Sequence, residues 1–347
     1  MGLTVSQIKK IPGARKAVMP EFISPQLATL VREPPSGAEW LHELKFDGYR
    51  MVCHLNRGKP RFWSRNGKDW TEKFPNLAGA LKSFPAVTAI LDGEVVVVDR
   101  AGRSSFQGLQ QAMGKGGKGG KGGKGGKAGD KVPAFVFEIF DLIYLDGYSL
   151  RQTPLRERKA ALEQLLADAK EKGPLRYSDH MEGSGAQFFK QACEYGIEGI
   201  VSKLAGSTYE STRNRNWLKT KCIKRQEFVI AGYTPSKNDF PGFGSLVLGV
   251  YKKGKLIYCG RVGTGFSIKQ RIELQKKLDR LSQTAMPFVA IPKDPGRRAA
   301  HWAKPQLVGE VEFMEWTADG VIRHPSFQGL REDKKATEII REEPENV

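Results

Sequence analysis

Apolar residues recur in short, strand-like runs through the first two thirds of the chain. In the run 51–55, Met51, Cys53 and Leu55 fall on one face at the two-residue period of a β-strand. Further strand-like runs cover residues 61–64, 90–98, 134–145, 199–204 and 217–222. Helical patterns interrupt these runs, and the mixture predicts an α+β domain that ends near residue 225.

Two helices are predicted between these strands. Thr153 and Pro154 are typical of an N-cap and a first helical turn, so a helix is expected to run from there to about Lys172. Gly173-Pro174 would end it. A second amphipathic stretch covers residues 184–195.

A second block of short strands follows. They are predicted at 227–233, 244–252, 255–262, 307–316 and 321–323. One helix between them is capped by Ser267 and is expected to turn Ile268, Ile272, Leu278 and Leu281 inward. Short strands around one helix, within about 120 residues, predict a small β-barrel of the oligonucleotide-binding (OB) type.

These patterns predict four regions. An N-terminal extension (1–18) precedes the α+β domain (19–225), and the OB-type barrel (226–340) is followed by a tail (341–347). Within the first domain, residues 114–129 form a Gly/Lys tract, which is expected to be an exposed flexible loop. This loop is either a solvated linker or a tether for nucleic-acid phosphates.

Charge and cysteine content narrow the class of protein. The 347 residues include 56 Lys and Arg against 38 Asp and Glu, a net charge of +18 that predicts an anionic partner, nucleic acid before a membrane surface. No apolar run approaches the roughly 20 residues that span a bilayer, and no signal peptide is recognised. Because Cys53, Cys193, Cys222 and Cys259 form no C-x-x-C pair, we expect no zinc site and free thiols in a reducing cytoplasm.

The segment 45–50, Lys-Phe-Asp-Gly-Tyr-Arg, carries the main candidate for chemistry. Lys45 is expected at a strand end, with Asp47 and Gly48 in a turn. Desolvation and a nearby cation such as Arg50 would leave its amine able to attack an electrophile. The alternative from these letters alone is an ordinary surface turn.

Further candidates follow in a fixed order along the chain: Glu43, Arg65, Glu94, Phe140, Glu198, the pair Lys219 and Lys221, and the pair Arg331 and Lys334. Glu94 is expected at the mouth of a strand, and Phe140 on an aromatic strand where it could stack on a base. Lys219 and Lys221 share one strand face and suit a phosphate. Glu138 places a charge inside the aromatic strand, toward either solvent or the pocket.

This set and order resembles the covalent nucleotidyltransferases, and most closely the ATP-dependent DNA ligases. Within these it is similar to the ligase domain of bacterial ligase D, an end-joining enzyme. Residues 19–28, 137–147 and 323–334 carry the closer resemblance, which covers about residues 19–340. It implies an adenylation domain with antiparallel sheets and flanking helices, followed by an OB-fold domain.

The resemblance also implies a role for each candidate. Lys45 would attack the α-phosphate of ATP and form a lysyl-adenylate. The nucleotide would be held by Glu43, Arg50, Arg65, Glu94, Phe140, Lys219, Lys221, Arg331 and Lys334, and a divalent ion by Glu94 and Glu198. The ion is expected to be Mg²⁺, with Mn²⁺ as an alternative. DNA contacts are expected from Arg213, Arg215 and the tract lysines Lys115, Lys118, Lys121, Lys124 and Lys127.

The expected reaction is therefore the sealing of 3′-hydroxyl and 5′-phosphate breaks in duplex DNA during double-strand break repair. An RNA ligase, a capping-type enzyme or an inactive nucleic-acid-binding relative remain alternatives. The expected partners are nicked or broken DNA, a Ku-type end-binding protein, and polymerase or nuclease proteins. We expect a monomer in the bacterial cytoplasm, associated with the nucleoid, that is either a standalone ligase or a domain of a larger protein.

Overall fold

The computed structural model describes residues 2–98, 104–116, 135–167, 173–236, 241–290 and 300–347, without the side chains of 111 and 114–116. The chain divides into two compact units. Unit 1 comprises Met1–Cys222 and Pro344–Val347, and unit 2 comprises Ile223–Glu343. Both combine helices with largely antiparallel sheets, which confirms the predicted α+β class.

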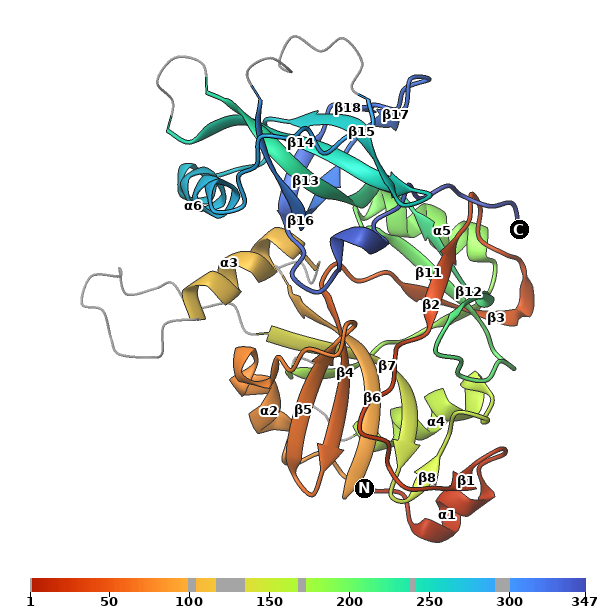
Figure 1. Ribbon diagram of the computed structural model, residues 1–347. Coiled ribbons are helices and arrows are strands. Elements are labelled where there is room, and N and C mark those ends of the chain that lie inside the picture. Colours follow the sequence, from red (N-terminus) through yellow and green to blue (C-terminus); the bar gives the residue numbers. More distant parts are fainter. Residues whose placement is uncertain (1, 99–103, 117–134, 168–172, 237–240, 291–299) are drawn as a thin grey trace. The chain divides into compact units, whose positions relative to one another are not determined.

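The larger sheet of unit 1, sheet A, has seven strands (Figure 1). Its order is β1 (Arg15–Lys16), β8 (Tyr148–Ser149), β7 (Phe135–Leu145), β6 (Thr88–Val97), β4 (Tyr49–Asn56) and β5 (Lys59–Ser64), with β9 (Leu175–Tyr177) paired in parallel to β7. The predicted strand runs at 51–55, 61–64, 90–98 and 134–145 thus correspond to neighbouring strands of this sheet.

Sheet B of unit 1 has five strands. Its order is β10 (Met181–Gly183), β3 (Gly37–Leu44), β11 (Gly199–Leu204), β12 (Arg213–Lys221) and β2 (Leu27–Leu30). All neighbours are antiparallel except β2 and β12, which run parallel. The ends of β3, β11 and β12 therefore bring together segments that lie far apart in the sequence.

The α-helices of unit 1 are α1 (Val5–Lys10), α2 (Pro75–Leu81), α3 (Phe106–Gly116), α4 (Leu155–Leu166) and α5 (Gly185–Glu194). A short 3-10 turn covers Thr71–Lys73. Helix α4 has Pro154 at its N-cap without the side-chain bond expected from Thr153, and ends at Leu166; the expected end at Lys172 lies outside the described residues. Ser184 caps α5 through a 3.3 Å hydrogen bond from the Gln187 amide, within the amphipathic stretch predicted at 184–195.

Sheet A is buried on both faces. All eleven residues of β7 are buried. Phe137 and Ile139 belong to the outer core, which includes residues of α1, α2, α3 and α4. Phe140 and Ile143 belong to an inner core that also contains Trp217 of sheet B. The inner core therefore joins the two sheets.

A β-bulge lies at Phe140 in β7. Asp92 pairs with Asp141 and Gly93 with Ile139, so that Phe140 is the extra residue in β7. A bulge changes which face the following side chains occupy. Gly93 is required here, because an added Cβ would lie 2.5 Å from the Glu138 carbonyl oxygen. The bulge therefore sets the faces of the residues after Phe140, whereas Phe140 itself alternates with Ile139 and lies on the inner face.

In the described part of unit 2, an antiparallel sheet packs against one α-helix. The sheet order is β15 (Lys255–Val262), β14 (Phe243–Lys252), β13 (Arg225–Pro235), β16 (His301–Glu312) and β19 (Ser326–Leu330). A separate pair joins β17 (Glu315–Trp316) and β18 (Ile322–Arg323), and a 3-10 turn covers Ala336–Glu338.

Helix α6 (Ile268–Asp279) differs from the prediction in the face it buries. Ser267 caps it as expected, but Leu274 and Leu278 are buried, while Ile268 and Ile272 are exposed. At roughly 100° per residue, the two isoleucines lie about a third of a turn from the leucines. The predicted apolar set therefore did not share one face.

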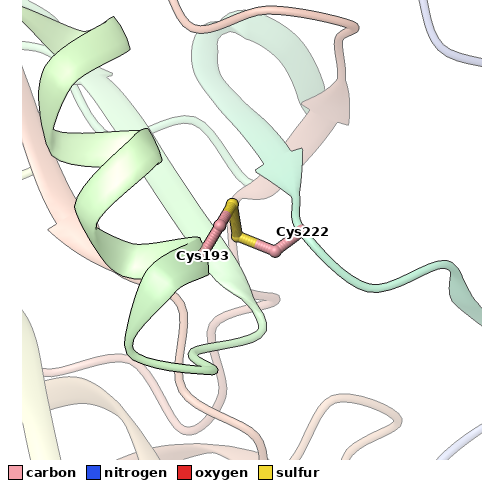
Figure 2. Close-up of a disulfide and its surroundings, with 2 residues drawn as sticks. All are labelled: Cys193 and Cys222. Carbon is pink, nitrogen blue, oxygen red and sulfur yellow. A yellow bond between two sulfur atoms is a disulfide. The ribbon is translucent and has the colours of Figure 1, made fainter.

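The expectation of four free thiols is wrong. Cys193 of α5 forms a disulfide with Cys222, directly after β12, with Cα atoms 5.3 Å apart (Figure 2). The other two cysteines, Cys53 and Cys259, are free and buried. The pair was missed because its partners are 29 residues apart, and only the packing of α5 beside β11 brings them together.

None of the helices in the described ranges has the length and apolar character that crossing a membrane requires.

Candidate functional site

A pocket in unit 1 is lined by residues of both sheets. Sheet B and its loops provide Gln26, Leu27, Ala28, Glu43, Leu44, Lys45, Phe46, Val201, Lys203, Arg213, Trp217 and Lys219, and sheet A provides Arg50, Arg65, Glu94 and Phe140. Eight of these were singled out from the sequence. The folding of sheet B against sheet A is what assembles them.

Lys45 is the first residue after β3. Its amide donates a 2.9 Å hydrogen bond to the Gly199 carbonyl, which fixes the backbone beside β11. Its side-chain nitrogen lies 2.5 Å from Oε2 of Glu198, and the lysine side chain is 22% exposed. The candidate nucleophile is thus held by a carboxylate at the mouth of the pocket.

Asp47 and Gly48, which follow in the segment 45–50, stabilise the backbone around Lys45. The Asp47 carboxylate accepts a 3.0 Å hydrogen bond from the Phe106 amide, at the first residue of α3. Gly48 leaves no room for a Cβ, which would clash with the Val95 carbonyl oxygen of β6. These two positions therefore serve the fold around Lys45, and explain the Asp-Gly pair in the motif.

Arg50 is clamped by a carboxylate on the adjacent strand. Its Nε and Nη2 donate to Asp92 at 2.5 and 2.7 Å, in a bidentate pair. Asp92 is fully buried and also accepts a 2.6 Å hydrogen bond from the Tyr209 hydroxyl. The guanidinium carbon lies 4.3 Å from the centre of the Phe140 ring. Asp92 and Tyr209 thus orient a cation within the pocket.

Glu43 is buried and receives three donors. Lys159 Nζ donates to Oε1 at 2.8 Å, Lys203 Nζ to Oε2 at 2.7 Å, and Ser178 Oγ to Oε2 at 3.3 Å. Burial opposes the ionised form, but the two ammonium groups outweigh it and lower the pKa of Glu43. Burial in turn lowers the pKa of Lys203 to about 8, against the attraction of Glu43. Glu43 is therefore held as an ionised carboxylate in the wall of the pocket.

Phe140 lies between aromatic and cationic neighbours. Its ring meets Trp217 edge to face, with centroids 6.1 Å apart. Lys203 Nζ lies 4.2 Å from the ring centre, so both Lys203 and Arg50 contact the ring through cation–π interactions. A base that stacks on Phe140 would therefore meet a ring that is already flanked by positive charge.

Glu94 and Arg65 also face the pocket. Glu94 lies within β6 rather than at a strand mouth, because the strand begins at Thr88, before the Asp-Gly-Glu motif, and continues after it to Val97. Arg65 directly follows β5. Glu138, opposite Glu94 in the β6–β7 pairing, is buried, and burial raises its pKa to about 7 despite Arg176 at 3.6 Å.

The predicted phosphate and DNA residues are distributed unevenly. Lys219 lines the pocket, whereas Lys221, two residues further along β12, is not among its lining residues. Arg213 lines the pocket and donates to the Ala28 carbonyl. Arg215 is exposed and pairs with Glu345 at 2.9 Å. The side chain of Lys115, and all of Lys118, Lys121, Lys124 and Lys127, lie outside the described residues.

Arg331 and Lys334 belong to unit 2, where they form an ion-pair network. Arg331 donates to Glu310 at 2.9 Å and to Asp333 at 2.7 and 2.9 Å. Lys334 donates to Glu227, which lies opposite Glu310 on the neighbouring strand. Like charges directly opposite on a sheet repel, and the two cations compensate this repulsion.

Comparison with known proteins settles the family. Residues 24–221 match the ATP dependent DNA ligase domain, and residues 240–334 match the ATP dependent DNA ligase C terminal region. The chain belongs to the ATP-dependent DNA ligase family. The resemblance inferred from the Lys45 motif and its partners is thereby confirmed.

Proteins named for non-homologous end joining are among the relatives of this chain. It is 40% identical over 332 residues to the multifunctional non-homologous end joining protein LigD of Pseudomonas aeruginosa, covering 95% of this chain and 38% of the relative. LigD of Mycobacterium bovis is 35% identical over 308 residues, covering 88% and 38%. The chain thus spans about two fifths of the length of these curated relatives.

A solved structure supports the same placement. The structure described as mycobacterial DNA ligase D complexed with ATP and MES aligns with a TM-score of 0.66 at 33% identity, covering 92% of this chain and 98% of that one. The pocket between sheets A and B therefore belongs to a ligase fold.

The donor set of this ligase chain suits a hard divalent cation. Mg²⁺ is usually held by one or two carboxylates together with substrate phosphates. Glu94 lines the pocket, and Glu198 contacts Lys45 at its edge. Within the described ranges no group of three His, Cys, Asp or Glu side chains gathers around one point. Two carboxylates beside a pocket that Lys45, Arg65 and Lys219 line fit the chemistry of Mg²⁺.

Several site residues of this ligase were not assigned from the sequence: Lys203, Lys159, Asp92, Tyr209 and Trp217. Lys203 was visible as a lysine at the end of a predicted strand, and Asp92 lies within the same Asp-Gly-Glu motif as Glu94. Lys159 and Tyr209 had no local signal, because their contacts to Glu43 and Asp92 join residues 116 and 117 positions apart.

Proposed function

We propose that this protein is an ATP-dependent DNA ligase that seals breaks in duplex DNA through a lysyl-adenylate on Lys45. The observation that carries the proposal is the convergence of Lys45, Glu198, Lys219 and Arg65 around one pocket of a ligase fold. The +18 net charge supports a polyanionic substrate.

In the first step, the Lys45 amine forms a P–N bond with the α-phosphate of ATP, and the bond to the β-phosphate breaks to release pyrophosphate. Lys45 must first lose a proton, and Glu198, which its Nζ contacts at 2.5 Å, is the carboxylate placed to accept it. Lys219 and Arg65 offer positive charge in the same pocket. Glu94 and Glu198 would hold Mg²⁺ or Mn²⁺, which neutralises phosphate charge when bound.

The remaining nucleotide contacts follow from the pocket. Glu43 and Phe140 would receive the adenine, and Arg50 with Glu94 would hold the ribose and its neighbours. Lys221 would contribute to the charge around the α-phosphate, and Arg331 and Lys334 would orient the pyrophosphate. AMP then passes to a DNA 5′-phosphate, and a 3′-hydroxyl displaces it to seal the strand.

The biological setting is proposed from the LigD relatives. Their printed names assign them to non-homologous end joining, so we infer a role in the repair of double-strand breaks in the bacterial nucleoid. A Ku-type end-binding protein and polymerase or nuclease partners would deliver the ends. Arg213, Arg215 and the tract lysines would contact the DNA.

Incubation with α-labelled ATP and Mg²⁺ tests the first step. Label is expected to join the protein through an acid-labile bond, and Lys45→Ala is expected to abolish it. Label retained by Lys45→Ala would overturn the assigned nucleophile. Sealing of a nicked DNA duplex but not of a nicked RNA duplex then separates the DNA ligase from an RNA ligase.

A further inference from the structure

We propose that Lys159 and Lys203 are positioning residues that set base specificity, by holding Glu43 as an acceptor-only carboxylate toward a purine with a 6-amino group. This inference rests on the proposed adenylation by Lys45. It concerns two lysines for which the motifs predicted no contact with the nucleotide.

The geometry around Glu43 is that of a closed clamp. One ammonium group contacts each carboxylate oxygen, Lys159 on Oε1 at 2.8 Å and Lys203 on Oε2 at 2.7 Å. Lys159 is anchored further by a 2.8 Å hydrogen bond to the Ser178 carbonyl, and the Ser178 hydroxyl donates to Glu43. All three charged side chains are at most 2% exposed. The carboxylate therefore has one orientation, with one edge at the pocket.

The clamp also determines the protonation state of Glu43. Two buried cations beside one carboxylate strongly favour its ionised form over the neutral acid. An ionised carboxylate only accepts hydrogen bonds, whereas a protonated one can also donate. Adenine presents a 6-amino donor, while 6-oxo purines such as guanine and hypoxanthine present an acceptor. The ionised Glu43 thus matches adenine and repels the 6-oxo group.

The two lysines reach Glu43 by different routes, which separates their effects. Lys203 lies on β11, lines the pocket and also contacts Phe140 at 4.2 Å. Lys159 lies on α4 and is not among the pocket-lining residues. An effect of Lys159 on the choice of base must therefore pass through Glu43, which makes it the cleaner test position.

The test compares lysyl-nucleotide formation from labelled ATP and from labelled ITP, which carries a 6-oxo group. Lys159→Met and Lys203→Met are expected to lower kcat/KM for ATP and to reduce the ATP-to-ITP preference at least tenfold. The exposed Lys190→Met on α5 is the matched control and should keep the wild-type preference. An equal loss with both nucleotides, at an unchanged preference, would overturn the proposal.

Two further variants keep the test decisive if a lysine variant does not fold. Ser178→Ala removes the weakest donor to Glu43 and should lower the preference by a smaller factor. Glu43→Gln offers both an acceptor and a donor and should bring the preference close to one. Adding Lys159→Met to Glu43→Gln should then leave the preference unchanged, and a further change would contradict action through Glu43. Failure of wild-type protein to take label from ATP would instead refute the proposed function itself.

Discussion

Lys45 and Glu198 form a close ion pair, with Nζ and Oε2 2.5 Å apart, across the junction of β3 and β11. An ammonium group cannot attack a phosphate, so the amine must be free of a proton when it reacts. Glu198 is anchored on its other side, since its carbonyl accepts a 2.9 Å hydrogen bond from the Cys222 amide. Activation of Lys45 therefore requires a change at Glu198 rather than at the backbone.

Glu198→Gln is the first prediction. The amide retains the shape of Glu198 but can neither accept the proton from Lys45 nor supply a charged ligand for a divalent ion. Lysyl-adenylate formation is expected to fall by roughly 10²-fold, the range typical of lost metal-site partners. Labelled ATP measures this rate, with the exposed Glu194→Gln as control. A rate within twofold of wild type would contradict the role of Glu198.

Tyr209→Phe is expected to raise KM for ATP several-fold while leaving kcat within a factor of two. The change removes the 2.6 Å hydrogen bond to Asp92, which holds Arg50 in its bidentate pair. A hydrogen bond to a charged group is worth about 1.5–3 kcal/mol, and only part of this is expected to reach ATP binding, because the bond is made to Asp92 and not to the nucleotide. Tyr195→Phe, on an exposed tyrosine, is the control. A loss confined to kcat would show that Arg50 does not act in ground-state binding.

Site residues could be predicted from the sequence where they lie within a short segment that has a recognisable strand pattern. The segments of Lys45, Glu94 and Lys219 each combine a strand pattern with a functional residue, and the fold brings all three to one pocket. The β-bulge at Phe140 could not be predicted, because a shift of one residue in pairing leaves no trace in the sequence of a strand that is buried on both faces.

Contacts between residues far apart in the sequence could not be predicted for a different reason. The contacts of Lys159 with Glu43 and of Cys193 with Cys222 depend on which helix covers which sheet. A lysine on an amphipathic helix is ordinarily solvated, so nothing in α4 distinguishes Lys159 from its neighbours before the helix is packed on β7 and β9.

Breaking the Cys193–Cys222 disulfide is expected to destabilise unit 1. The bond closes a loop with a sequence separation of 29 residues, and a loop of this size corresponds to roughly 3–4 kcal/mol in the chain-entropy treatment. Cys193→Ser and Cys222→Ser should lower the unfolding midpoint equally, and the double variant no further than either single one. Unequal or additive effects would show that the thiols act separately.

Arg331→Ala is expected to cost stability as well as adenylation. It leaves the buried Glu310 and Asp333 without their cation, and removing one partner of a buried pair typically costs about 3–5 kcal/mol. Lys334→Ala should be milder, because Arg331 Nη1 remains 3.8 Å from Glu227. Both variants should seal a DNA strand that is already adenylated at rates close to wild type. A matching loss in that step would place both residues outside pyrophosphate handling.

Glu138 gives the structure a predictable dependence on pH. Burial raises its pKa from 4.5 to about 7 in the folded chain, with Arg176 on one side and Glu94 opposite on β6. The folded state therefore binds a proton that the unfolded state releases above pH 4.5. The contribution of Glu138 to stability is fully present below that pH, and is lost as the pH rises to about 7.

Glu138→Gln removes this titration and should flatten the pH profile of unfolding. The variant is expected to match wild type near pH 4 and to exceed it at pH 8 by up to about 3 kcal/mol, since each pKa unit corresponds to 1.36 kcal/mol. Urea unfolding of both proteins across this range measures the difference, with the exposed Glu163→Gln as control. If Glu138→Gln were instead less stable than wild type at pH 8, Glu138 would be ionised in the fold, and its pair with Arg176 would be stabilising.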